Sequence, residues 1–247
     1  KVDVHKDPEL VAEVLALALQ EPGYRHLALS AGTILSDYLG NSEVDHYVIY
    51  LEAIRKHLKV WFPSFFQIVA HCEDEARKLF DTGVGTLQHN MEVWDKRLWD
   101  ILCPGKARFI GYDEWIRRMV HSAKVFGEAR IVSNFVSGVE MLRPFGFTDV
   151  DDAVNSTLDG FDYLMGNGVL PRMDVWVVEA NSRLSDQQPT PFDYYLKMAR
   201  GYYELRKKHG MPFPAGFCRG CNINDVMCDW EYYDRLASRQ EHVAAIS

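Results

Sequence analysis

The sequence predicts an α/β fold whose parallel sheet forms a partial, open TIM barrel of the (β/α)6 type. Short apolar segments alternate with amphipathic helical segments about five times along the chain, a pattern typical of parallel strands covered by helices. Right-handed crossovers between such strands build a sheet that curves toward a barrel. About five repeats are too few for a closed eight-stranded barrel, so we expect an open one.

The composition indicates a large globular domain. The chain has 247 residues, of which 47% are hydrophobic, and a formal net charge of −8. This length is enough to bury a substantial core, and the acidic balance argues against nucleic acid as the main partner. No segment approaches the roughly 18 unbroken apolar residues of a membrane span, and no signal peptide is visible. We therefore expect no membrane partner, while the oligomeric state stays open.

Helix-capping residues and helix-breaking residues define the predicted elements in the first half of the chain. Asp7-Pro8 supplies a cap and a first-turn proline for a helix over residues 7–20, and Pro22-Gly23 interrupts it. Next we expect a strand over 26–30, a tight turn over 31–33, a helix over 43–58, an extended aromatic segment over 59–69 and a helix over 73–81.

The same signals continue through the second half. We expect strands over 84–87, 130–136 and 173–178, and helices over 93–102, 112–126, 149–165 and 191–209. Pro104-Gly105-Lys106 is expected to be a turn. A Gly- and Pro-rich segment from residue 210 leads to a cysteine cluster and a short predicted helix over 230–240. We therefore expect a barrel domain over residues 1–209 and a Cys-rich extension over residues 210–247.

A dense polar cluster follows the strand predicted over 84–87. His89, Asn90 and Glu92 place an imidazole, an amide and a carboxylate within a few residues of its end. Ligands bind at the carboxyl ends of strands in repeating strand–helix proteins, so these residues are the first candidates for a ligand site. In the alternative, His89 binds a backbone carbonyl, and Asn90 and Glu92 cap the next helix.

Three cysteines are closely spaced in the C-terminal extension. Cys218, Cys221 and Cys228 form a three-thiolate pattern, and thiolates suit iron–sulfur clusters and zinc. An auxiliary iron–sulfur cluster is the first interpretation, zinc with a fourth ligand such as His209 is the second, and unliganded cysteines are the third.

Three motifs carry a resemblance to a known family. Leu87-Gln-His-Asn-Met-Glu-Val93 resembles the strand-end motif of the radical S-adenosylmethionine (radical SAM) enzymes closest to biotin synthase and lipoyl synthase. Ser30-Ala31-Gly32-Thr33 is similar to the small-residue motif after their second strand. The stretch from Ser133 to Glu140 resembles their fifth-strand motif, with serines at both glycine positions. The order and spacing agree, and the resemblance covers about residues 1 to 209.

The resemblance implies a set of residues that contact S-adenosylmethionine. Asn90 and Glu92 would bind its ribose, with His89 beside them, and the turn after the second strand would contact its amino group. A carboxylate suits the ribose because it accepts hydrogen bonds from two vicinal hydroxyls. The complete set of implied cofactor-binding residues is Ser30, Ala31, Gly32, Thr33, His89, Asn90, Glu92, Ser137, Glu140 and Val178. Glu140 has the alternative of an ordinary helix-start carboxylate.

The sequence departs from the family pattern in two places. The Cys-x3-Cys-x2-Cys loop that holds the radical [4Fe–4S] cluster is not present, and it would lie just before the helix over 7–20. Because the sequence opens at Lys1 without a first strand, we expect the loop in a missing N-terminal part. Trp115 stands where biotin synthase has an arginine, so Lys106, Arg117 and Arg118 are candidate cations for the cofactor carboxylate.

The resemblance implies a radical SAM enzyme. Such an enzyme cleaves S-adenosylmethionine reductively to a 5′-deoxyadenosyl radical, which abstracts hydrogen from a small-molecule or cofactor-precursor substrate. Sulfur insertion and carbon-skeleton chemistry, with an auxiliary cluster, are both open, and no catalytic residue is assigned. The implied reductant is ferredoxin or flavodoxin, and oxygen-labile clusters imply a reducing cytoplasm. The alternative is a catalytically degenerate partial-barrel scaffold or partner subunit with a structural metal site. An ordinary barrel lyase or aldolase is weaker, because no Schiff-base lysine or metal triad stands at a strand end.

Overall fold

In the part of the chain that the structure describes, five parallel strands form one sheet in chain order. The computed structural model describes residues 6–23, 27–30, 32–34, 40–58 and 64–212. The strands are β1 (Leu27–Ser30), β2 (Ser64–Gln67), β3 (Thr86–Gln88), β4 (Ile131–Ser137) and β5 (Val169–Val175). Each pairs in parallel with the next, and among these strands β1 and β5 form the two edges of the sheet. This arrangement confirms the predicted α/β fold with an open, partial barrel.

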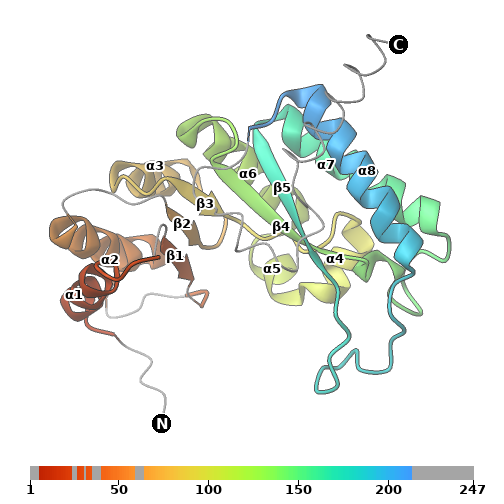
Figure 1. Cartoon of the computed structure of the whole chain (residues 1–247), viewed down its shortest axis with the longest axis horizontal. Helices are drawn as coiled ribbons and strands as arrows, with labels where there is room; N and C mark the ends of the chain where they lie inside the picture. Colours follow the sequence, from red (N-terminus) through yellow and green to blue (C-terminus); the bar gives the residue numbers. More distant parts are fainter. Residues whose placement is uncertain (1–5, 24–26, 31, 35–39, 59–63, 213–247) are drawn as a thin grey trace.

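Helices follow the strands and lie along the sheet (Figure 1). They are α1 (Pro8–Ala18), α2 (Glu43–His57), α3 (Glu73–Asp81), α4 (Lys96–Leu102), α5 (Pro104–Phe109), α6 (Tyr112–Phe126), α7 (Val150–Gly166) and α8 (Phe192–His209). A 3-10 turn, η1 (Val139–Met141), follows β4. In Figure 1, α1 and α2 lie beside β1 at one end of the molecule, and α7 and α8 lie side by side at the other.

The two faces of the sheet differ in chemistry. In register across β2, β3 and β4 lie Phe66, Leu87 and Ile131, which are almost completely buried. On this face Phe135 of β4 also packs edge-on against Phe161 of α7, with ring centroids 4.8 Å apart. Successive side chains of a strand point to opposite faces of the sheet. The residues that alternate with these apolar residues therefore form the second face, which is more polar. The apolar face holds the main core, and the polar face is the inside of the open barrel.

Side-chain caps explain why several helices begin where they do. Asp7, Ser42, Asp95 and Asp149 each accept a hydrogen bond from a backbone N–H of the first turn of α1, α2, α4 and α7, respectively. Such a cap satisfies one of the amide groups that an α-helix leaves unpaired at its start. The predicted bounds of residues 112–126 agree with α6 because glycines flank the apolar pattern on both sides.

Three predicted segments differ from the structure. Residues 104–106, predicted as a turn, begin the helix α5, because a proline is well tolerated in the first turn. The helix predicted over 93–102 is α4, which begins only at Lys96 because Asp95 caps it. The last strand, predicted over 173–178, is β5 and begins at Val169; it includes Pro171, which an edge strand tolerates because one side of its backbone needs no partner.

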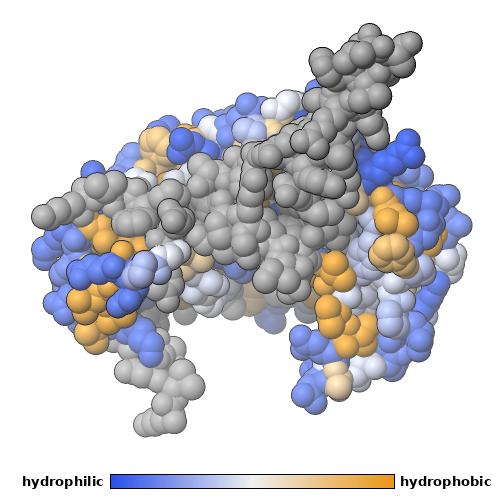
Figure 2. All heavy atoms as spheres, viewed as in Figure 1, coloured by the Kyte–Doolittle hydropathy of each residue, from blue (hydrophilic) through white to orange (hydrophobic). Residues whose placement is uncertain are grey.

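In the view of Figure 2, hydrophobic atoms gather over α1 at one end of the molecule and in further areas at the opposite end, among hydrophilic atoms. Leu10, Val14 and Leu17 of this helix are exposed. None of the helices in the described ranges is long and apolar enough to cross a membrane. The predicted terminal helix over 230–240 lies outside the described residues.

Candidate functional site

The polar cluster after β3 continues along β4 and does not start a helix. The backbone N–H groups of His89 and Met91 donate to Val132 and Asn134 of β4, and Val136 donates to the carbonyl of Glu92. The cap of the next helix is Asp95. The capping alternative for Asn90 and Glu92 is therefore wrong, because the chain remains hydrogen-bonded to β4 through Glu92 and starts no helix there.

Glu92 has a left-handed backbone conformation, with φ of 73°. This region is uncommon for a residue with a Cβ atom and costs about 1–2 kcal/mol. Strain of this kind persists only where the surrounding structure enforces it, and it is concentrated at functional sites. Here the bonds to β4 on both sides of Glu92 enforce it.

Lys106, in α5, joins the two polar residues of this cluster. Its Nζ donates to the backbone carbonyl of Asn90 at 2.6 Å and to Oε1 of Glu92 at 2.8 Å. The ammonium group also lies 4.8 Å from the centre of the Trp115 ring, a distance at which a cation is attracted to the aromatic face. The side chains of Lys106 and Glu92 are 26% and 28% exposed, so the pair remains accessible to a ligand.

A small pocket of about 140 Å³ lies at the carboxyl ends of β1, β2 and β3. Its lining residues come from the segments that follow these strands and from α2, α5 and α6. They are Gly32, Thr33, Glu43, Tyr47, Gln67, Ile68, Val69, Asn90, Glu92, Lys106 and Trp115. The structure therefore brings together Gly32, Thr33, Asn90 and Glu92, which the sequence motifs assigned to one ligand.

The segment after β1 is held by two side chains of α2. Tyr47 Oη donates to the carbonyl of Gly32 at 2.8 Å, and Glu43 Oε1 accepts from the backbone N–H of Ile34 at 2.9 Å. Burial raises the pKa of Tyr47 to about 12, so its hydroxyl stays a donor at neutral pH. A second cavity of about 470 Å³ shares Gly32, Thr33 and Tyr47 with the pocket and also includes Ser30.

His89 directly follows β3 and does not line the pocket. It is 1% exposed, and its Nδ1 lies 2.9 Å from the carbonyl of Ile68. Burial lowers its pKa to about 4, so the ring is neutral and Nδ1–H is the donor. The alternative in which His89 binds a backbone carbonyl agrees with this bond. Its Nε2 is buried and has no hydrogen-bond partner among the described residues.

The inner face of the open barrel carries polar side chains in neighbouring strands. Gln67 and Gln88 are in register, and Asn134 of β4 is in register with Arg172 of β5. Asn134 Nδ2 donates to Asp174 at 2.8 Å. The side-chain oxygens of Gln88 and Asn134 are buried without a partner in the part of the chain that the structure describes. Unpaired buried polar atoms are costly, so a polar ligand on this face would remove that cost.

The fifth-strand motif is enclosed by protein. Glu140 is fully buried, and its carboxylate accepts from Gly138 N, Thr157 Oγ1 and Tyr194 Oη at 2.8, 2.8 and 3.0 Å. Burial raises the pKa of Glu140 above its usual range. Ser137 is equally buried. Direct contact of these two side chains with a ligand stays a prediction from the motif.

The remaining predicted residues fall into three groups. Val178 lies half-buried, three residues beyond the end of β5. His209, the candidate zinc ligand, has its Nε2 2.6 Å from Asp162. Outside the described residues lie Ala31 and the three cysteines Cys218, Cys221 and Cys228. Within the described ranges there is no cluster of His, Cys, Asp and Glu side chains suited to a metal ion.

The three candidate cations for the cofactor carboxylate lie in different places in the structure. Lys106 lines the pocket. Arg117 pairs with Glu114 on the outer surface, and Arg118 donates to Glu114 and to the carbonyl of Ala70. The sequence alone could not distinguish among these three cations, because only the packing of α5 against the segment after β3 places Lys106 at the pocket.

Sequence reasoning also missed Glu43 and Tyr47 as pocket residues. Their spacing of four residues at the start of a helix was the available signal, because such residues share one helix face.

Comparisons with known proteins add two findings. No protein-family model matches the chain. The chain is 24% identical over 143 residues to the bacteriochlorophyllide c C-7(1)-hydroxylase of Chlorobaculum limnaeum, a match that covers 56% of this chain and 33% of the hydroxylase. The fold is similar to the crystal structure of HydG, a maturase of the [FeFe]-hydrogenase, with a TM-score of 0.56 and 16% identity over 83% of this chain and 43% of HydG.

The sequence match to the hydroxylase supports the radical SAM superfamily. Similarity to HydG concerns the fold and agrees with the open, partial barrel. The chain spans about a third of the hydroxylase and less than half of HydG, so both are much longer proteins. Neither comparison distinguishes the biotin synthase branch of the radical SAM enzymes from the others.

Proposed function

We propose that this chain is the cofactor-binding barrel of a radical SAM enzyme and that S-adenosylmethionine binds at the carboxyl ends of β1, β2 and β3. One observation carries the proposal. The strained Glu92, the carbonyl and side chain of Asn90 and the cation of Lys106 meet the Gly32–Thr33 segment in one pocket. Its superfamily relatives and the order of the three sequence motifs support the same assignment.

The donor and acceptor set of the pocket fits this cofactor. Glu92 uses Oε1 for Lys106, and its other carboxylate oxygen is an acceptor for ribose hydroxyls. Lys106 Nζ has three N–H donors, two of which are directed at Asn90 and Glu92. The third is a donor for the carboxylate of the methionine part. In this proposal Lys106, backed by Trp115, replaces the arginine that the family pattern leads one to expect.

The cofactor, when reduced by a [4Fe–4S] cluster, supplies a radical that abstracts hydrogen from a substrate. The tasks of this chain are binding, orientation and exclusion of water. At the pocket rim Gly32 has no side chain and Thr33 has a small one, so that a ligand approaches the backbone closely. Gln67, Gln88 and Asn134 present polar groups on the inner face, where we place a small polar substrate.

The finer assignments extend this proposal. The electron comes from ferredoxin or flavodoxin, and Cys218, Cys221 and Cys228 hold an auxiliary iron–sulfur cluster. Sulfur insertion and carbon-skeleton chemistry are both compatible with a polar inner face and a second cluster. Val178 and the residue before it flank the adenine.

The first test is binding of S-adenosylmethionine by isothermal titration calorimetry. Lys106→Met removes two charge-assisted hydrogen bonds, and we expect a weakening of binding by about tenfold or more. Lys106→Arg keeps the charge and is expected to lose less. Glu114→Gln is the matched control, because Glu114 forms its ion pairs with Arg117 and Arg118 on the outer surface. An unchanged dissociation constant in Lys106→Met refutes the assignment of this pocket.

The second test addresses the chemistry. Anaerobic iron and sulfide analysis with electron paramagnetic resonance, on protein from the complete gene, is expected to give about eight irons and a signal that S-adenosylmethionine perturbs. An iron content of about four, with a signal that S-adenosylmethionine does not change and with iron that is lost in Cys218→Ala, supports the scaffold alternative. A single zinc without iron removes both cluster assignments.

A further inference from the structure

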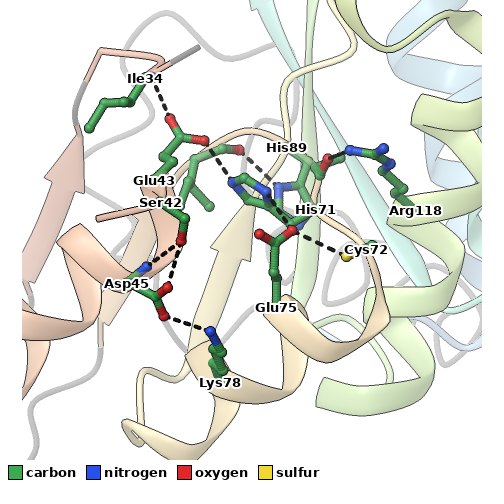
Figure 3. A network of polar contacts seen from close by, with 12 residues as sticks. Ile34, Ser42, Glu43, Asp45, His71, Cys72, Glu75, Lys78, His89 and Arg118 are labelled. Atoms are coloured by element: carbon green, nitrogen blue, oxygen red, sulfur yellow. Dashed lines mark hydrogen bonds and ion pairs between the residues drawn. The ribbon is translucent and has the colours of Figure 1, made fainter. Parts of the chain in front are cut away.

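A half-buried histidine lies between two carboxylates next to the pocket (Figure 3). His71 follows β2, and its Nε2 is 2.7 Å from Glu43 Oε2, while its Nδ1 is 3.1 Å from Glu75 Oε2. Glu43 is the first residue of α2, and Glu75 lies in the first turn of α3. The side chains of His71 and Glu43 are only 12% and 5% exposed. The triad therefore links three segments in a place that is largely shielded from water.

The triad reaches the pocket through Glu43. While Oε2 of Glu43 faces His71, its Oε1 accepts from the backbone N–H of Ile34. One turn further along α2, Tyr47 holds the carbonyl of Gly32. Glu43 and Tyr47 themselves line the pocket together with Gly32 and Thr33. The orientation of the Glu43 carboxylate thus sets the backbone position of the segment after β1.

Geometry determines which form of His71 suits this arrangement. An ionised carboxylate only accepts hydrogen bonds, and both ring nitrogens of His71 face carboxylate oxygens. Both contacts are hydrogen bonds only if both nitrogens carry a proton, which makes the ring an imidazolium. In the neutral ring, one nitrogen lone pair faces a carboxylate oxygen, and that contact becomes repulsive.

The other titratable and charged groups around the triad have partners of their own. From α2, Asp45 pairs with Lys78 of α3. Cys72 Sγ donates to the same oxygen of Glu75 that faces His71, and burial raises the pKa of the Cys72 thiol, so it stays a donor. From α6, Arg118 donates to Glu114 and to a backbone carbonyl.

Near His71, directly after β3, His89 is neutral because burial lowers its pKa to about 4 (Figure 3). Tyr47 stays protonated, since burial raises its pKa to about 12. Neither His89 nor Tyr47 therefore adds a charge beside the triad at neutral pH.

We infer that His71 is a positioning residue for S-adenosylmethionine: as an imidazolium it orients Glu43, and through Glu43 it fixes the backbone from Gly32 to Ile34 at the rim of the pocket. The inference rests on the proposed function, because it takes that pocket as the cofactor site. It assigns pH dependence to cofactor binding and a specific role to a histidine that no sequence motif singled out.

The test compares the pH profiles of S-adenosylmethionine binding in the wild type and in Glu43→Gln. In the variant, the amide oxygen accepts from Ile34 N–H and the amide N–H donates to a neutral His71, so both contacts persist without the second ring proton. We expect the wild-type affinity to fall about tenfold as the pH rises from about 6 to about 8.5. The profile of Glu43→Gln is expected to be flat over this range.

Two further variants control the experiment. Glu43→Ala removes the acceptor of Ile34 N–H and is expected to weaken binding about tenfold at every pH, and urea unfolding checks that it folds. His57→Gln is the matched histidine control, because His57 pairs with Glu9 of α1; its profile is expected to follow the wild type.

The outcomes separate the two proposals. A wild-type protein that binds no S-adenosylmethionine at any pH overturns the proposed function itself. Binding that is independent of pH in the wild type, or equally pH-dependent in Glu43→Gln, overturns the role of His71 and leaves the pocket assignment intact. Nitrogen-15 chemical shifts of His71 that show a single ring proton at pH 6 also overturn it.

Discussion

The backbone strain at Glu92 leads to a prediction that needs no cofactor. We compare Glu92→Ala with Glu92→Gly. Both variants lose the ion pair with Lys106, so its contribution cancels between them. They differ in the Cβ atom, which is unfavourable at a φ of 73° by about 1–2 kcal/mol. The glycine variant avoids this cost, but about 0.5–1 kcal/mol of its advantage is lost because glycine makes the unfolded chain more flexible. The glycine variant is therefore expected to be more stable than the alanine variant by about 1 kcal/mol.

Urea unfolding followed by tryptophan fluorescence measures the difference in the free energy of unfolding. The matched control is the pair Glu114→Ala and Glu114→Gly in the ordinary helix α6, where glycine is expected to be less stable by about 1 kcal/mol. If the alanine variant at position 92 equals or exceeds the glycine variant, the left-handed conformation at the site is refuted. Both position-92 variants are expected to lose S-adenosylmethionine binding, which separates the stability of the site from its function.

Three further predictions concern the structure that supports the site. Glu140→Ala leaves three buried donors without an acceptor and is expected to cost about 4 kcal/mol in urea unfolding, whereas Glu140→Gln costs less. Gly160→Ala places a Cβ atom 2.2 Å from the Trp94 ring and is expected to lower stability by about 2 kcal/mol, measured by thermal unfolding. Because burial lowers the pKa of His89 to about 4, the fold holds its neutral form. The contribution of this neutral form to the free energy of unfolding is complete above pH 6.5. It is lost as the pH falls toward 4, and the loss amounts to about 3 kcal/mol. Unfolding curves at several pH values are expected to show less acid sensitivity in His89→Asn.

Local signals in the sequence determined much of the architecture. Alternation of apolar segments with amphipathic helices was sufficient to predict a parallel sheet, because a parallel connection needs a crossover that covers the sheet. Caps and glycines set the bounds of helices such as α1 and α6 within a few residues. The polar cluster at Asn90 and Glu92 was recognisable because residues at the carboxyl end of one strand are placed at the ligand edge by the fold class itself.

Tertiary structure decided which side chains meet at that edge. Glu43, Tyr47 and Lys106 come from helices that approach the strand ends from different parts of the chain, and no local pattern records this approach. His89 looked like a ligand residue in sequence, yet packing buries it against the carbonyl of Ile68. The sequence by itself thus determined the fold class and the edge of the sheet at which we propose that a ligand binds, because these depend on local periodicity. The partners of each polar group were decided by long-range packing, because hydrogen bonds and charge pairs depend on distances that only the folded chain sets.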